Sequence, residues 1–167
     1  MSDEASRAAE IRLSIDIAAP TAIVWAALTD PDLMARWMLD SRIEVHSGRR
    51  VGSPIVIRGD LHGIPFENRG TILAFEPGRV FQYDYWSTLS FPVIPDAPEN
   101  YSTVRFELHP IEAGTRLALT LGRFVDDSVP RHARLYWTGT LPTLREFCER
   151  RDDPRGLEGD REDGRQS

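Results

Sequence analysis

The longest regular pattern of apolar positions lies toward the C-terminal end of the chain, between Asp127 and Arg151. Apolar residues recur there at spacings of three and four, which places them on one stripe of a helix. Pro142 lies inside the segment and removes one backbone hydrogen bond, so we expect a long helix with a kink near this residue. The apolar stripe comprises Ala133, Trp137, Leu141, Leu144 and Cys148.

Most of the remaining chain alternates apolar and polar residues with a period of two, as half-buried strands do. A first strand is predicted at 11–18, and two short helices follow between Pro20 and Trp37. Six further strands are separated by short connections rich in turn-forming residues, with no helix between them, which favours an antiparallel meander. They are expected at 42–45, 54–61, 66–75, 79–86, 101–109 and 115–124.

These elements predict an α+β fold, in which a curved antiparallel sheet of about six to seven strands is covered on its concave face by the long C-terminal helix. In the last hairpin, alternate residues are apolar on both strands, and we expect this face to contact the helix. Arg123 continues the alternation of the second strand, so its guanidinium is expected to point toward the inner side. The two apolar sets are Val104, Phe106 and Leu108, and Leu117, Leu119 and Leu121.

The length and composition fit one domain with a full hydrophobic core. The chain has 167 residues, of which 41% are hydrophobic, and this is enough to bury a core and to enclose a cavity if the sheet curves. We expect the domain to span residues 11–151. Residues 1–10 are polar and are predicted to be a flexible N-terminus, and the charged segment 152–167 is predicted to be a disordered tail.

The charge balance and the N-terminal segment narrow the function classes. The net charge of −6 and the scattered arginines argue against a nucleic-acid partner. No apolar run opens the chain, so neither a signal peptide nor a membrane span is expected, and a cytoplasmic location is predicted. All 20 basic residues are arginine, which indicates a GC-rich bacterial genome. Cys148 is the single cysteine and is expected to be a buried, inert thiol.

No sharp catalytic signature is present in the sequence. It contains no Gly-rich phosphate loop, nucleophile elbow, paired-histidine metal helix or spaced cysteine set. The four histidines are widely separated, so we expect no metal site and no cofactor. Asp60, Glu67 and Asp84 could be general bases if an apolar cavity raised their pKa, but strand carboxylates are usually exposed. We therefore assign no catalytic residue.

Aromatic residues gather near one end of the predicted sheet. Aromatic side chains usually serve packing, but a curved sheet that holds a helix can leave a concave apolar space with a few polar groups, as small-molecule sites have. We expect Arg123, Tyr85 and Tyr136 to supply polar groups, with Trp37, Trp86 and Trp137 enclosing the apolar part. The Pro-rich segment 89–100 is interpreted as a lid or a partner-facing edge. The candidate ligand-binding residues are Trp37, Tyr83, Tyr85, Trp86, Phe91, Tyr101, Arg123, Tyr136 and Trp137.

Four stretches carry a resemblance to a known superfamily. They are IDIAAPTAIVWAALTDPDLMARWM (15–38), RGTILAFEPGRVFQY (69–83), STVRFELHPIEAGTRLALT (102–120) and YWTGTLPTLREF (136–147). In this order they resemble the helix-grip fold of the START-like or SRPBCC superfamily, in the branch related to activators of heat-shock-protein ATPase and to polyketide cyclase-like proteins. The resemblance covers about residues 11 to 150. It departs at Pro142, because the terminal helix of the family is usually uninterrupted.

The aromatic inner face and the missing catalytic motifs favour a binding module for a small hydrophobic ligand, such as a lipid, a polyketide-like compound or another apolar metabolite. The resemblance leaves two alternatives open. One is a cyclase, dehydratase or hydrolase that works in the same cavity, and the other is a co-chaperone-like protein-interaction module. A homodimer that buries the Pro-rich segment is also possible.

Overall fold

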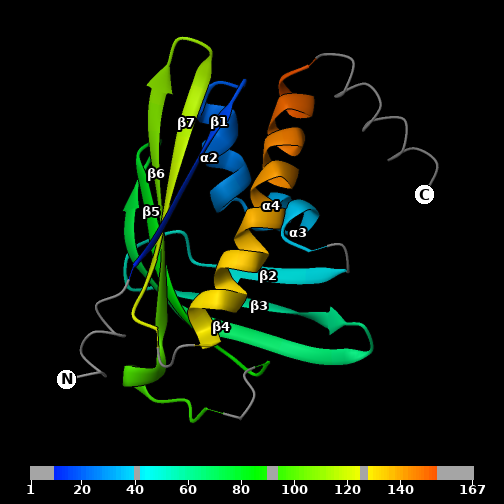
Figure 1. The fold of residues 1–167 in the computed structure, drawn as a ribbon, viewed down its shortest axis with the longest axis vertical. Helices are drawn as coiled ribbons and strands as arrows, with labels where there is room; N and C mark the ends of the chain where they lie inside the picture. Colours follow the sequence, from blue (N-terminus) through cyan, green and yellow to red (C-terminus); the bar gives the residue numbers. More distant parts are fainter. Residues whose placement is uncertain (1–9, 40–41, 90–93, 125–127, 154–167) are drawn as a thin grey trace.

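The computed structural model describes residues 10–39, 42–89, 94–124 and 128–153. Its strands form one seven-stranded antiparallel sheet with the order β1-β7-β6-β5-β4-β3-β2, and α4 crosses its concave side (Figure 1). The α+β helix-grip architecture expected from the sequence is confirmed. The elements are β1 (Ile11–Ile17), α2 (Thr21–Thr29), α3 (Pro31–Trp37), β2 (Ile43–Ser47), β3 (Pro54–Leu61), β4 (Ile64–Glu76), β5 (Val80–Ser87), η1 (Pro98–Asn100), β6 (Ser102–Ile111), β7 (Gly114–Gly122) and α4 (Ser128–Asp152).

The two short helices after β1 are separated by one residue that serves both. The backbone N–H of Asp30 donates to the carbonyl of Ala26 and ends α2, while its side chain accepts from the N–H of Asp32 and caps α3. Pro31 follows at the first helical position, where a proline is tolerated. The indole N–H of Trp37 donates to the carbonyl of Ala27 at 2.8 Å. This bond ties the end of α3 to α2.

The apolar faces expected in the last hairpin form the centre of the core. All six residues of the two sets are at most 4% exposed, and they belong to one cluster with Leu141, Leu144 and Cys148 of α4. Burial raises the pKa of the Cys148 thiol to about 12, so at neutral pH the group stays protonated. The expectation of a buried, inert thiol therefore agrees with its surroundings.

The helix α4 runs from Ser128 to Asp152 and continues through Pro142. Pro142 and Thr138 are both exposed, so the carbonyl of Thr138, which loses its helical donor, can bond to water. A shape change of the helix at this residue stays a prediction.

The sheet bends between β4 and β5, and this bend positions the candidate site. The pairing of these strands shifts its register between Ile72 and Ala74, which is the local irregularity of a β-bulge. Figure 1 shows β2, β3 and β4 turned away from the direction of β5, β6 and β7, with the first turns of α4 between the two parts. The bend leaves space between the sheet and the first half of α4.

Candidate functional site

A cavity of about 510 Å³ lies between the first half of α4 and the inner face of strands β2 to β6. Two of its lining residues, Leu89 and His132, are exposed and mark the mouth. Most of the wall is apolar, because strands that are buried on one face present every second residue to the inside. The apolar lining comprises Met38, Leu39, Ile43, Ile55, Ile57, Leu61, Phe66, Leu89, Ile94, Val104 and Ala133, with Trp137 and Trp86.

Polar groups gather on the wall formed by β4, β5 and β6. Asn68 is the cross-strand partner of Ser87, and Tyr85 is the partner of Ser102, so these four residues lie side by side on neighbouring strands. All four line the cavity. The side-chain oxygen Oδ1 of Asn68 is buried and has no hydrogen-bond partner in the described part of the chain.

Three tyrosines contribute phenol groups to the same cavity. Burial raises the pKa of Tyr83, Tyr85 and Tyr136, so all three are neutral at physiological pH. The hydroxyl of Tyr136 donates to the carbonyl of Met38 at 2.6 Å. This bond fixes the first half of α4 against the end of α3 and closes one side of the cavity.

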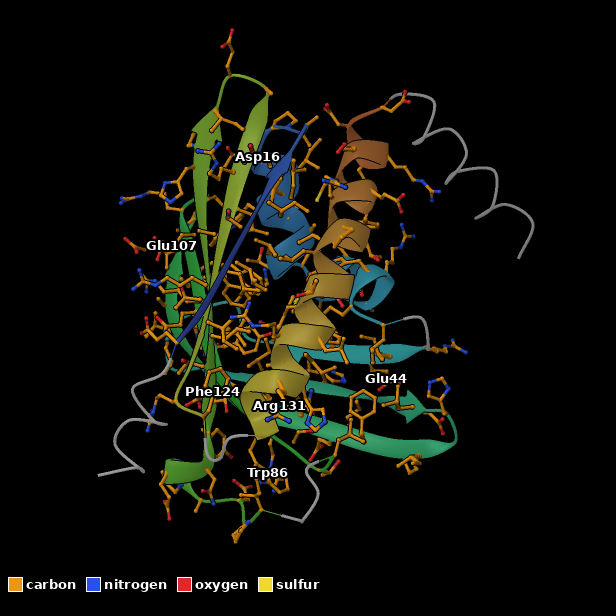
Figure 2. The ribbon with its side chains drawn as sticks, in the orientation of Figure 1. Asp16, Glu44, Trp86, Glu107, Phe124 and Arg131 are labelled. Carbon is orange, nitrogen blue, oxygen red and sulfur yellow. The ribbon has the colours of Figure 1, made fainter. Side chains whose placement is uncertain are left out.

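The rim of the cavity, residues 94–100, is held to the sheet by the side chains of Trp86 and Arg69. Trp86 is the cross-strand partner of Arg69, and its indole N–H donates to the carbonyl of Ile94 at 2.8 Å. The guanidinium of Arg69 lies 4.9 Å from the centre of the Trp86 ring, in cation–π geometry. Figure 2 shows Trp86 at the same end of the molecule as Arg131 in the first turns of α4.

Asp96 joins this rim to the sheet through two partners. It accepts from the hydroxyl of Tyr101 and from the guanidinium of Arg69, with an Nε to Oδ2 distance of 2.8 Å. Tyr101 and Arg69 together hold the pKa of Asp96 below its ordinary value of 3.8. A carboxyl with a lowered pKa stabilises the folded state above its unfolded pKa, and this contribution is lost as the pH falls through the lower folded value. The bonds of Asp96 to Arg69 and Tyr101 therefore persist at neutral and mildly acidic pH.

We predict that Asp96→Ala loosens the rim segment without unfolding the domain. Chymotrypsin should cleave between residues 86 and 101 several-fold faster in this variant at pH 7, because the segment loses its tie to Arg69 and Tyr101. Cleavage sites can be mapped by mass spectrometry. Glu99→Ala is the control, since Glu99 is exposed in the same segment. Equal cleavage rates in the two variants would contradict the role of Asp96.

Five of the nine candidate residues line the cavity: Tyr83, Tyr85, Trp86, Tyr136 and Trp137. Phe91 lies outside the described residues. Trp37 is a core residue rather than a lining residue, because its indole is used to join the two short helices. Tyr101 lies outside the cavity because its hydroxyl is bonded to Asp96.

The expectation that Arg123 points inward is wrong. The residue is exposed and has a left-handed backbone conformation, with φ of 57°, just after the end of β7 at Gly122. The alternation of side chains holds only while a strand stays extended, so it cannot be continued through this turn. The cavity therefore lacks the cation that was expected to orient a carboxylate or phenolate.

Sequence analysis missed Asn68 and the apolar wall from β2 and β3. Asn68 lies two residues after the buried Phe66, on the inward-facing side of β4, so the alternation could have placed it inside. The apolar residues Ile43, Ile55 and Ile57 were expected only as strand residues. Their position in the wall follows from the bend of the sheet, which no local pattern reports.

Among the described residues, no group of histidine, cysteine or carboxylate side chains has the arrangement of a metal site. No helix in the described part of the chain is long and apolar enough to cross a membrane.

The bent antiparallel sheet, the long helix across it and the cavity between them define a helix-grip protein, and comparison with known proteins specifies the family. The family model described as activator of Hsp90 ATPase homolog 1-like protein matches residues 18–149. The chain belongs to this family, which confirms the resemblance seen in the sequence. No curated protein gives a significant match.

Solved structures agree with this assignment. The solution structure of ChR145 from Cytophaga hutchinsonii is 31% identical, with a TM-score of 0.70 over 86% of this chain and 95% of that chain. CalU16 from Micromonospora echinospora is 25% identical, with a TM-score of 0.60 over 94% and 83% of the respective chains. The Aha1 dimer from Colwellia psychrerythraea is 19% identical, with a TM-score of 0.66 over 84% and 96%, and it supports the fold alone.

Proposed function

We propose that this protein binds a small hydrophobic or aromatic molecule in the cavity between α4 and the sheet. The observation that carries the proposal is the cavity itself, whose volume of about 510 Å³ lies within the range of roughly 300–1,000 Å³ found for small-molecule sites. Its walls are mainly apolar, and Asn68, Tyr85, Ser87 and Ser102 gather on the wall formed by β4, β5 and β6. Candidate occupants are lipids, polyketide-like compounds and other apolar metabolites.

The proposal is tested by filling the cavity. Ala133 lines it from α4, so Ala133→Trp should weaken binding of the neutral fluorescent probe N-phenyl-1-naphthylamine by at least about tenfold, which corresponds to about 1.4 kcal/mol. Leu61→Trp fills the space from β3 and serves as a second blocking variant. Leu135→Trp is the matched control, because Leu135 is exposed on the same helix.

Native mass spectrometry of the protein as purified shows directly whether a small molecule travels with it. Probe binding that is equal in the blocking variants and in the control, together with no retained small molecule, would overturn the proposal. The melting temperature of each variant separates a blocked cavity from a destabilised fold.

An enzyme that uses the same cavity needs an acid or base within reach of the substrate. None of the described lining residues is Asp or Glu. Glu67 is bonded to Arg58 and Arg69 on the outer face, and Asp84 accepts from the backbone N–H of Thr71. The geometry therefore gives no support to the general bases considered from the sequence.

A further inference from the structure

Two phenol groups of the cavity, those of Tyr83 and Tyr85, make no hydrogen bond within the described part of the chain. Buried tyrosine hydroxyls usually have a partner, so this pair needs an explanation. Other polar side chains of the lining are already bonded. The hydroxyl of Tyr136 donates to Met38, that of Ser102 to Arg123 and the indole of Trp86 to Ile94, while the amide of Asn100 donates to Pro95 and the hydroxyl of Ser87 accepts from the N–H of Leu89.

Both free hydroxyls keep surface that a ligand can reach. Among the described residues, the polar side-chain atoms that are sealed from solvent and also unpaired are Oδ1 of Asn68 and Oε2 of Glu149. The hydroxyls of Tyr83 and Tyr85 are unpaired but do not belong to this sealed group, so each retains accessible surface. Tyr83 is only 3% exposed and lines the cavity, and Tyr85 is partly buried and lines it as well. The accessible surface of these hydroxyls therefore faces the cavity.

The two tyrosines form one donor group on the wall. They lie two residues apart on β5, so their side chains point to the same side of the sheet. Their cross-strand partners on β6, Val104 and Ser102, line the cavity too. Burial raises the pKa of both phenols, and the nearby Tyr136 and Tyr85 raise that of Tyr83 further. Both phenols therefore stay protonated, and each has an O–H proton to donate.

We propose that the natural ligand is an uncharged apolar molecule that carries a carbonyl group, and that the carbonyl oxygen accepts a hydrogen bond from the Tyr83 and Tyr85 pair. The inference rests on the proposed function of the cavity and names its ligand class. Ketones, quinones, esters and amides with an apolar body belong to this class. Pure hydrocarbons and carboxylates do not.

The chemistry of phenols favours an acceptor on the ligand. A phenol oxygen shares a lone pair with its ring, so its O–H is a good donor and its oxygen is a weak acceptor. A carbonyl oxygen has two lone pairs and no proton, which complements a pair of donors. A ligand that displaces water from a polar group without replacing the hydrogen bond loses affinity. The tyrosine pair therefore discriminates against an analogue that lacks the acceptor.

The charges of the lining account for the uncharged ligand. None of the described lining residues is arginine, aspartate or glutamate, and His132 lies at the exposed mouth. Arg123, the expected cation, lies outside the cavity. A buried charge without a partner of opposite sign is strongly unfavourable. A carboxylate should therefore bind more weakly than a ketone of the same size.

The test compares three naphthalene probes of similar size: 2-acetylnaphthalene, which carries a carbonyl, 2-ethylnaphthalene, which does not, and 2-naphthoate. The affinity of each is measured by displacement of N-phenyl-1-naphthylamine. In the double variant Tyr83→Phe/Tyr85→Phe, the affinity ratio of 2-acetylnaphthalene to 2-ethylnaphthalene should fall by at least about fivefold, because the carbonyl loses its donors. The wild-type protein should bind 2-naphthoate at least about tenfold more weakly than 2-acetylnaphthalene.

The carbonyl stretching band gives a readout that a merely structural role of the tyrosines would not move. In isotope-edited infrared spectra of 2-acetylnaphthalene bound to the wild type, the band should lie at lower wavenumber than in hexane. In the double variant it should return toward its position in hexane. Tyr101→Phe is the matched control, because the hydroxyl of Tyr101 is bonded to Asp96 outside the cavity. It should leave both the band and the affinity ratio unchanged.

The outcomes separate this inference from the proposed function. The wild-type band is informative even if the double variant does not fold. An unchanged affinity ratio in the double variant, a wild-type band at its hexane position, or tighter binding of 2-naphthoate than of 2-acetylnaphthalene would overturn the inference while leaving the cavity function standing. Failure of N-phenyl-1-naphthylamine and all three probes to bind would overturn both.

Discussion

Replacing Trp137 with alanine should lower the free energy of unfolding by about 3–5 kcal/mol, the range found for large aromatic residues removed from a core. Trp137 is 4% exposed, and its ring contacts Phe106, Tyr136 and Trp37 at centroid distances of 5.6, 5.0 and 6.3 Å. Trp137 belongs to the hydrophobic core and also lines the cavity, so it lies where the two meet. For a domain of this size the melting temperature should fall by roughly 10 °C, measurable by calorimetry and by urea unfolding.

Leu135→Ala is the control for this prediction. Leu135 is 75% exposed on the same helix, so its removal should change the free energy of unfolding by less than about 0.5 kcal/mol. Trp137→Phe should give an intermediate loss, because a smaller ring keeps part of the packing. A loss below about 1 kcal/mol for Trp137→Ala would show that the packing of this ring contributes little to the stability of the core.

Replacing Gly70 with alanine should destabilise the protein by about 3 kcal/mol or prevent folding. A methyl group on Gly70 would overlap the backbone carbonyl of Asp84 on the neighbouring strand, and backbone atoms cannot move aside as a flexible side chain can. Asp84 is further held because its side chain accepts from the N–H of Thr71 at 2.8 Å. Strands β4 and β5 would have to separate at the bend that shapes the cavity.

Replacing Gly139 with alanine should stabilise the protein instead. Gly139 is exposed inside α4, and an added methyl group there meets nothing within 4 Å. Alanine is favoured over glycine in a helix interior by about 1 kcal/mol, so Gly139→Ala should raise the free energy of unfolding by about that amount. Urea unfolding of both variants checks the pair. A loss for Gly139→Ala or no loss for Gly70→Ala would contradict the packing described here.

The strands and helices follow from local patterns because most of them are buried on one side. The alternation at 11–18 predicted β1 to within one residue of Ile11–Ile17. The pattern is weaker where burial ends. The predicted strand 66–75 is Ile64–Glu76 in the structure, since the backbone ladder continues toward the hairpin turn although Ile64 is 60% exposed. Hydrogen bonding sets that boundary, and hydrophobicity does not report it.

The candidate site was less accessible to sequence reasoning. Tyr83, Tyr85, Tyr136 and Trp137 were predicted as ligand-binding residues and line the cavity. The prediction for Arg123 was wrong because its own left-handed backbone conformation ended the alternation on which the prediction depended. Trp37 was predicted to enclose the ligand and does not line the cavity. An aromatic residue on a helix can equally join two helices, as the bond from Trp37 to Ala27 does.

The sequence by itself determined the order of the elements, the buried face of the last hairpin and the resemblance to the family, because each of these depends on side-chain chemistry at short spacing. Only the tertiary structure decided which side chains meet in the cavity. The cross-strand register placed Asn68 beside Ser87, the bend at Ile72 and Ala74 opened the space, and the bond from Tyr136 to Met38 fixed the helix over it. These contacts join residues far apart in the chain, and no local period encodes their distance or depth.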